Sequence, residues 1–173
     1  PPAPAQATPR RWEGTPQIVL RLLRADLPPV VDYGWPPVAP ATPGAARLLF
    51  RYGEAEVGHN APLAPLLRYR DGEVIEARRD LALEARAAAR LTTLGFRTLR
   101  GSGRWTSRHN DDFLPGEGGE EDWWEALHHD LPALKALGWR IEIDADFPIR
   151  LVSASGDFAA ALHERSGVDW LDL

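Results

Sequence analysis

LLRYRDGEVIEARRDLALEARAAARLTTLG, residues 66–95, is the stretch that decides the fold. Its first part places Asp71-Gly72 between two strand-like runs, and Asp-Gly supplies the positive φ values of a tight hairpin turn. Asp80 then stands in an N-cap position before leucines and alanines at helical spacing, and Gly95 marks the helix end. We therefore predict an antiparallel hairpin over 67–77 followed by a helix over 80–94.

A second helical region and a second hairpin are expected farther along the chain. Acidic residues at 120–122 suit a helix start, and Pro132 predicts two helical pieces over 120–137, the second beginning at Asp130. Five large apolar residues share one helical stripe there: Trp123, Leu127, Leu131, Leu134 and Leu137. From Trp139 to Asp144 apolar and charged residues alternate, which predicts a hairpin over 139–152 with its apolar set buried.

The other segments complete an α+β domain, in which antiparallel sheet hairpins carry two helical regions packed on one face. The run 17–24 suits a buried strand, with a helix as the alternative, and alternation predicts a strand near 48–53. For 158–165 strand and helix both stay open, with strand favoured.

Domain boundaries follow from composition. Residues 1–16 are rich in Pro and Ala and predict a flexible entry segment, so the domain spans 17–173. The Gly-rich, charged run 97–119 predicts a long loop, where weak strands at its edges and a division into two subdomains both stay open. The chain starts without Met and stops within a strand-like pattern, so we expect an excerpt truncated at its C-terminal end.

Composition limits the chemistry. The 173 residues contain no Cys, which excludes disulfides, thiolate nucleophiles and Cys-based zinc sites. No apolar run approaches the roughly 20 residues of a membrane span, and no signal peptide precedes the domain, so we expect a cytoplasmic location without membrane contact.

Catalytic motifs are missing from the sequence. The single lysine, Lys135, follows no Gly-rich turn, so a P-loop is excluded, and no serine stands in Gly-x-Ser-x-Gly. Adjacent His128 and His129 cannot face one metal, and the acidic residues around Asp111-Asp112 lack EF-hand spacing, which favours a solvated acidic loop. We expect no catalytic site, no metal site and no small-molecule substrate.

One stretch combines basic and aromatic residues. The net charge of −5 gives no overall attraction to phosphate, so any nucleic-acid contact must come from a local patch. The candidate residues lie in the predicted loop: Arg97, Arg100, Arg104, Trp105 and Arg108. Their guanidinium groups would contact phosphates and the indole would stack on a base. A solvated, arginine-biased loop is the alternative.

Three stretches, finally, resemble a known family. They run from Arg79 to Phe96, from Trp123 to Asp144, and over Ser166-Gly167-Val168-Asp169-Trp170-Leu171-Asp172-Leu173. Their order and spacing across roughly residues 45–173 resemble the region that precedes the motor in bacterial SWI/SNF-related DEAD/DEAH-like helicases. No catalytic residue of that family maps onto this chain.

The resemblance implies a DNA-dependent ATPase whose ATP and Mg²⁺ sites lie in later motor domains. This segment would then be a non-catalytic accessory or regulatory domain, with the motor domains of the same chain as its partner and DNA as a second candidate. The alternatives are a protein-interaction module without a motor and a small independent enzyme, which would need a pocket with convergent ionisable groups.

Overall fold

The computed structural model describes residues 10–25, 44–70, 73–101 and 111–149. Their elements follow one another as β1 (Arg10–Trp12), β2 (Gln17–Arg24), β3 (Gly44–Tyr52), β4 (Ala55–Gly58), β5 (Leu66–Arg70), β6 (Glu73–Ala77), α1 (Leu81–Thr93), β7 (Phe96–Thr98), β8 (Phe113–Pro115), α2 (Glu120–Glu125), the π-helical turn η1 (Ala126–Asp130), α3 (Leu131–Ala136) and β9 (Arg140–Ile143). These strands form two sheets, one central and one small.

The central sheet is built around the long antiparallel pair β2 and β3. Its strand order is β7-β8-β3-β2-β9, and β4 pairs with β3. Residues in register share a face of a sheet. Leu20 therefore lies beside Leu48 on one face, while Arg21 lies beside Arg47 on the other. The strands predicted over 17–24 and near 48–53 are confirmed.

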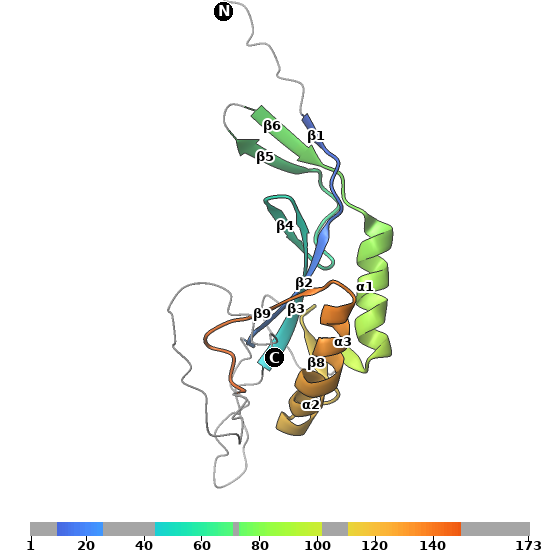
Figure 1. The fold of residues 1–173 in the computed structure, drawn as a ribbon, viewed down its shortest axis with the longest axis vertical. Coiled ribbons are helices and arrows are strands. Elements are labelled where there is room, and N and C mark those ends of the chain that lie inside the picture. The colour runs from blue at the N-terminus through green and yellow to red at the C-terminus, as the bar shows by residue number, and fades with distance from the viewer. Residues whose placement is uncertain (1–9, 26–43, 71–72, 102–110, 150–173) are drawn as a thin grey trace, which may run out of the picture.

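The helices cover the apolar face of this sheet (Figure 1). Trp123 of α2 is fully buried there, with its ring centroid 6.5 Å from that of Phe96 and 5.2 Å from that of Phe147. Edge-to-face aromatic packing of this kind adds to the free energy gained by burying the rings. The predicted α+β class, with helices packed on a mostly antiparallel sheet, is confirmed.

The small sheet has the order β1-β6-β5 and lies beyond one end of the central sheet (Figure 1). Its β5 and β6 are the hairpin predicted over 67–77, although turn residues 71–72 lie outside the described residues. The third strand, β1, is parallel to β6 and falls within the predicted entry segment 1–16. That prediction is wrong for Arg10–Trp12, because Trp12 packs edge-on against Tyr52 and this burial offsets the ordering cost.

Helix α1 confirms the helix predicted over 80–94. The Asp80 side chain accepts a hydrogen bond from the Leu83 N–H at 2.9 Å, and Gly95 follows the helix with φ +86°. The leucines and alanines at helical spacing predict a buried stripe of Leu81, Ala85, Ala88, Leu91 and Leu94. The buried side differs from it, since Glu84 is buried and Leu81 is 47% exposed. At 13 residues α1 is the longest helix described, and none of the described helices combines the length and apolarity of a membrane span.

The helical region after residue 119 is continuous rather than broken into two separate pieces. The π-helical turn η1 joins α2 to α3, and the N–H of Leu131 donates to the carbonyl oxygen of Ala126. Asp130 is the N-cap of α3, as predicted, and Pro132 lies in the first turn of α3, directly after the π-helical turn. The predicted stripe is buried except for Leu137, which is 61% exposed.

The first arm of the hairpin predicted over 139–152 is confirmed as the strand β9, and its pairing with the second arm stays a prediction. β9 is parallel to β2, with Leu20 beside Ile141, and Ile149 belongs to no strand. The rest of that second arm, and the segment 158–165, lie outside the described residues. The edge strands that the sequence left open for the loop 97–119 are present: β7 and β8 pair antiparallel and β8 joins β3. Both strands belong to the central sheet.

Candidate functional site

The predicted nucleic-acid residues are only partly described. Arg97 is tied to the chain ahead of α2, because its Nε and Nη2 donate to the Gly116 carbonyl at 3.0 and 2.8 Å and the guanidinium pairs with Glu117. Arg100 is exposed. Arg104, Trp105 and Arg108 lie outside the described residues, so the grouping of these five side chains stays a prediction.

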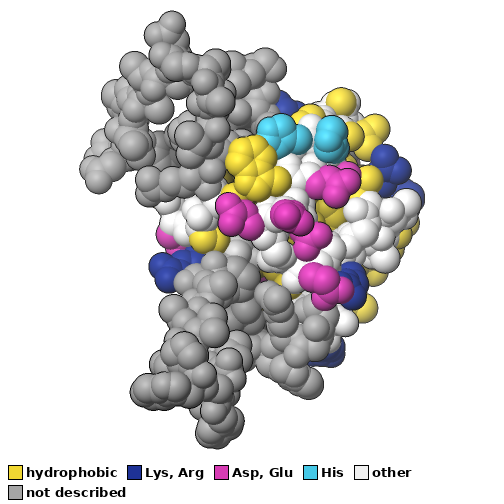
Figure 2. All heavy atoms as spheres, turned by 90° about the horizontal axis from the view of Figure 1, so that it is seen from below, with side chains coloured by type: hydrophobic (Ala, Val, Ile, Leu, Met, Phe, Trp, Pro, Cys, Tyr) yellow, Lys and Arg dark blue, Asp and Glu magenta, His cyan; other side chains and the backbone are white. Residues whose placement is uncertain are grey.

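The surroundings of Arg97 are acidic. The first turn of α2 carries Glu120, Glu121 and Asp122, and the Asp122 carboxylate accepts from the backbone N–H groups of Glu117 and Gly119, each at 3.0 Å. Figure 2, the view from below, shows acidic and histidine side chains gathered on this face. A phosphate chain approaching Arg97 would meet these carboxylates, which weakens the electrostatic attraction.

An aromatic pair marks the π-helical turn on the same helical region. The rings of Trp124 and His128 stack with centroids 4.9 Å apart, and His128 Nδ1 lies 2.9 Å from the Trp124 carbonyl oxygen. His128 and His129 are both exposed. Among the described residues, no three His, Cys, Asp or Glu side chains gather as metal ligands would.

A buried ion pair lies at the start of α1, and a tyrosine hydroxyl links it to the end of β3. Arg79 donates from Nε and Nη2 to the two carboxylate oxygens of Glu84 at 3.0 and 2.6 Å, and both side chains are 6% exposed. The Tyr52 hydroxyl also donates to Glu84, at 2.7 Å, and accepts from the Asp80 N–H at 2.8 Å. Burial, followed by this bond to Glu84, raises the pKa of Tyr52. The side chains of Arg79, Glu84 and Tyr52 are therefore all bonded to other groups of the protein, which is a structural role.

A second set of charges lies on the face of the central sheet turned away from the helices. Arg21 and Arg51 both pair with Glu56 of β4 and with Glu142 of β9, at 2.8–3.1 Å. Burial alone would raise the pKa of Glu142, but the hydrogen bonds from the two arginines outweigh it and hold this pKa below 4.5. Arg140 also pairs with Glu142, at 2.9 Å, so three arginines share two carboxylates and each arginine of the network has an acidic partner.

A further ion pair corrects the prediction of a solvated acidic loop. Asp112 is 5% exposed, and its two oxygens accept from Nε and Nη2 of Arg47 at 2.9 and 2.8 Å. The pair joins β3 to the residue just before β8. Sequence spacing gave no sign of this pairing, because 65 residues separate the partners.

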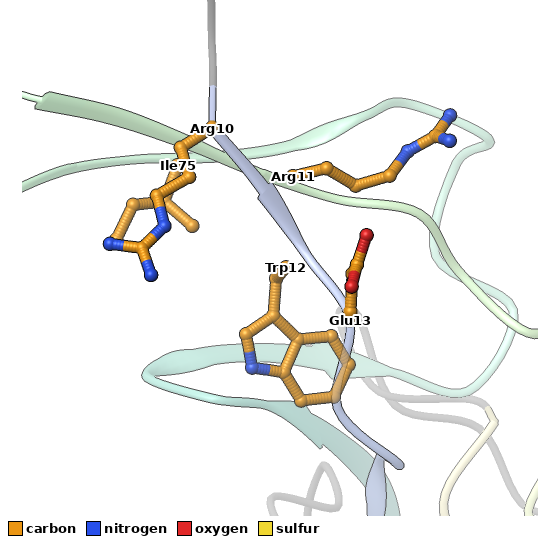
Figure 3. Close-up of a pocket in the computed structure, with 5 residues that line it drawn as sticks. All are labelled: Arg10, Arg11, Trp12, Glu13 and Ile75. Atoms are coloured by element: carbon orange, nitrogen blue, oxygen red, sulfur yellow. The ribbon is translucent and has the colours of Figure 1, made fainter.

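The small sheet carries a different kind of surface. An open hollow of about 620 Å³ is lined by Arg10, Arg11, Trp12, Glu13 and Ile75. Figure 3 shows the two guanidinium groups on opposite sides of β1, with the indole of Trp12 below them and the carboxylate of Glu13 on the side of Arg11. Arg10, Arg11 and Glu13 are exposed and Trp12 is half-buried. This surface, unlike the ion pairs above, combines exposed arginines with an accessible aromatic ring.

Two glycines hold the Trp12 indole in place. A Cβ atom at Gly14 would overlap Cζ2 of Trp12, and one at Gly53 would lie 3.0 Å from its Nε1. Beneath the indole, a smaller hollow of about 210 Å³ separates the small sheet from the β3–β4 turn. The indole is therefore fixed on its protein side and accessible from the larger hollow.

Sequence reasoning missed this surface, because the Pro- and Ala-rich flank made 1–16 resemble a linker. The available signal was Arg10-Arg11-Trp12 followed closely by Gly14, a bulky aromatic beside a residue that admits close approach. Comparison with protein-family models, with curated proteins and with solved structures gave no match to this chain.

Proposed function

We propose that this chain is a non-catalytic accessory or regulatory segment of a SWI/SNF-type ATP-dependent DNA helicase or translocase. The motor domains of the same polypeptide are its partner, and they supply the ATP and Mg²⁺ sites. The chain works in the cytoplasm, where such a motor meets DNA. A protein-interaction module with no motor attached is the alternative.

One observation carries the proposal: two of the three stretches that resemble the helicase family build a single core. The first stretch contributes Leu91 and Phe96, and the second contributes Trp123 and Leu134, each at most 2% exposed and all in one cluster. A resemblance confined to short surface motifs could arise by chance. Here the resembling residues pack together in one folded unit. The third stretch, 166–173, lies outside the described residues.

The buried charges support a structural role for the same unit. Glu84 belongs to the first stretch and Glu142 to the second, and both are held by arginines. In an active site, by contrast, at least one ionisable group faces the substrate with its proton available for transfer.

The coding sequence beyond Leu173 provides the first test. Helicase motifs downstream, with a P-loop and an acidic box, are the expected result, and a stop codon directly after Leu173 would overturn the proposal. ATP turnover is the second test. The 173-residue chain should hydrolyse no ATP with or without DNA, whereas the full-length product should do so when duplex DNA is added. Turnover by the isolated chain would contradict the non-catalytic role.

A further inference from the structure

We propose that the small sheet binds single-stranded DNA, with Arg10 and Arg11 contacting phosphates and Trp12 stacking on a base. The choice of DNA rests on the proposed function. The surface itself does not, because it follows from the residues that line the hollow on β1 and β6.

The charge of Arg11 is available for a ligand. Arg11 is exposed, and it forms no ion pair with any other described residue. Arg21, Arg47 and Arg97 differ in this respect, since each already pairs with a carboxylate. Arg10 adds a second exposed guanidinium one residue away, on the other side of the strand (Figure 3). Two phosphates of one strand can thus be contacted from either side of β1.

Strand register places Arg10 and Trp12 on one face of the small sheet. Arg10 pairs with Ile75, and two residues along the strand Trp12 pairs with Ala77. Arg11, the position between them, pairs with Glu76 and lies on the opposite face. The exposed Arg10 therefore shares a face with the aromatic ring. Basic side chains beside an aromatic ring are the combination that binds single strands in other proteins.

The fixed indole favours a single strand over a duplex. A base can stack on Trp12 only when it is unpaired and turned outward, whereas duplex bases are already stacked on one another. Gly14, Gly53 and Tyr52 hold the ring before any ligand arrives, which reduces the ordering entropy lost on binding. The hollow of about 620 Å³ is within the roughly 300–1,000 Å³ typical of ligand sites.

Glu13 opposes this binding and provides a test in the opposite direction. Its exposed carboxylate lines the same hollow, so it repels a phosphate there. Glu13→Gln should tighten binding severalfold, which general damage to the fold would not do. Arg11→Gln should weaken binding by about three- to tenfold and lower the salt slope by roughly 0.7, the value for one phosphate contact on a single strand.

The experiment is a fluorescence-anisotropy titration of the 173-residue chain with labelled oligo-dT at several salt concentrations. Arg100→Gln is the matched control, because Arg100 is also exposed and lies beyond the other end of α1, about 20 Å away by helix rise. Gly14→Ala should displace the indole and weaken binding without changing charge, and Gly58→Ala, where a Cβ meets nothing within 4 Å, is its control. The expected result is binding that responds to Arg11, Glu13 and Gly14 but not to the controls.

Four outcomes would overturn the proposal. They are no binding at low salt, binding unchanged in Arg11→Gln and Gly14→Ala, equal or tighter binding of duplex, and equal competition by polyglutamate, which would indicate charge attraction alone. If Arg100→Gln lost binding instead, the interface would be the loop at 97–108 that the sequence predicted, and not the small sheet. None of these outcomes bears on the helicase motifs sought downstream, so the two proposals fail separately.

Discussion

Removing the Glu84 carboxylate tests the most deeply buried charge pair that the structure describes. In Glu84→Ala, Arg79 loses both hydrogen bonds from Nε and Nη2, and the Tyr52 hydroxyl loses its acceptor. Arg79 cannot swing into solvent without further loss, because its Nη1 also donates to the carbonyl oxygens of Ala61 and Pro62, both at 2.9 Å. The charge therefore stays buried and unpaired.

The expected loss follows from this geometry. Breaking a buried ion pair by removing one partner costs about 3–5 kcal/mol, and both side chains here are only 6% exposed. For a chain of this size each kcal/mol lowers the melting temperature by about 2–4 °C, so Tm should fall by roughly 6 to 20 °C. Urea denaturation followed by circular dichroism measures the free energy of unfolding, and a thermal melt measures Tm.

Two further variants distinguish the cost of a buried, unpaired charge from general damage to the fold. Arg86→Ala changes an exposed arginine on the same helix and should alter the free energy of unfolding by no more than about 0.5 kcal/mol. The double variant Arg79→Leu with Glu84→Leu removes both charges and should recover most of the lost stability, since an apolar replacement of a buried pair is often neutral. A loss below about 1 kcal/mol in Glu84→Ala would refute the reasoning.

Three other predictions concern backbone, core and pH, each checked by urea denaturation. Gly95→Ala should destabilise the chain by about 1 kcal/mol, because φ is +86° there. Gly58→Ala, at negative φ and with equally open space, should change the free energy of unfolding little. Equal effects would contradict the φ argument. Leu134→Ala, at a fully buried site, should lower the free energy of unfolding by about 2–5 kcal/mol. Leu137→Ala, at a site 61% exposed, should lower it by well under half of that amount. Similar losses would mean that Leu137 is also packed. The pKa of Glu142 is lower in the folded chain, so its contribution to stability is fully present above about pH 4.5 and is lost as pH falls through the folded pKa. Glu142→Gln should therefore flatten the decline in the free energy of unfolding below pH 4.5. An unchanged slope would contradict the ion network.

Local sequence signals predicted those elements whose contacts are local. The hairpin over 67–77 and helix α1 depend on a turn, a cap and a glycine within a few residues of one another. Glu84 was placed outside the buried stripe of α1 because a periodicity argument counts only apolar residues. Its partner Tyr52 lies 32 residues away, and no spacing rule connects the two.

The candidate site shows the same limit. Arg97 is a basic residue in a Gly-rich stretch, which suggested phosphate contact, yet the fold brings Glu117 to it from 20 residues away. Arg11 and Trp12 were assigned to a linker, because the pairing of β1 with β6 spans more than 60 residues and leaves no local pattern. Composition therefore identified the residue types correctly, but tertiary pairing decides which of them keep an available charge.

The parallel pairing of β9 with β2 has a consequence during synthesis on the ribosome. Arg21 and Glu142 are 121 residues apart, so β2 emerges long before the strand that covers its second edge. Until residue 143 has left the exit tunnel, β2 can pair only with β3. Its second edge therefore keeps unpaired N–H and C=O groups on an apolar strand, where other nascent chains can bind them. Long-range pairing also slows folding. Arg21 and Arg24 are the charged residues of β2, and their charges hinder its association with a second copy of the chain.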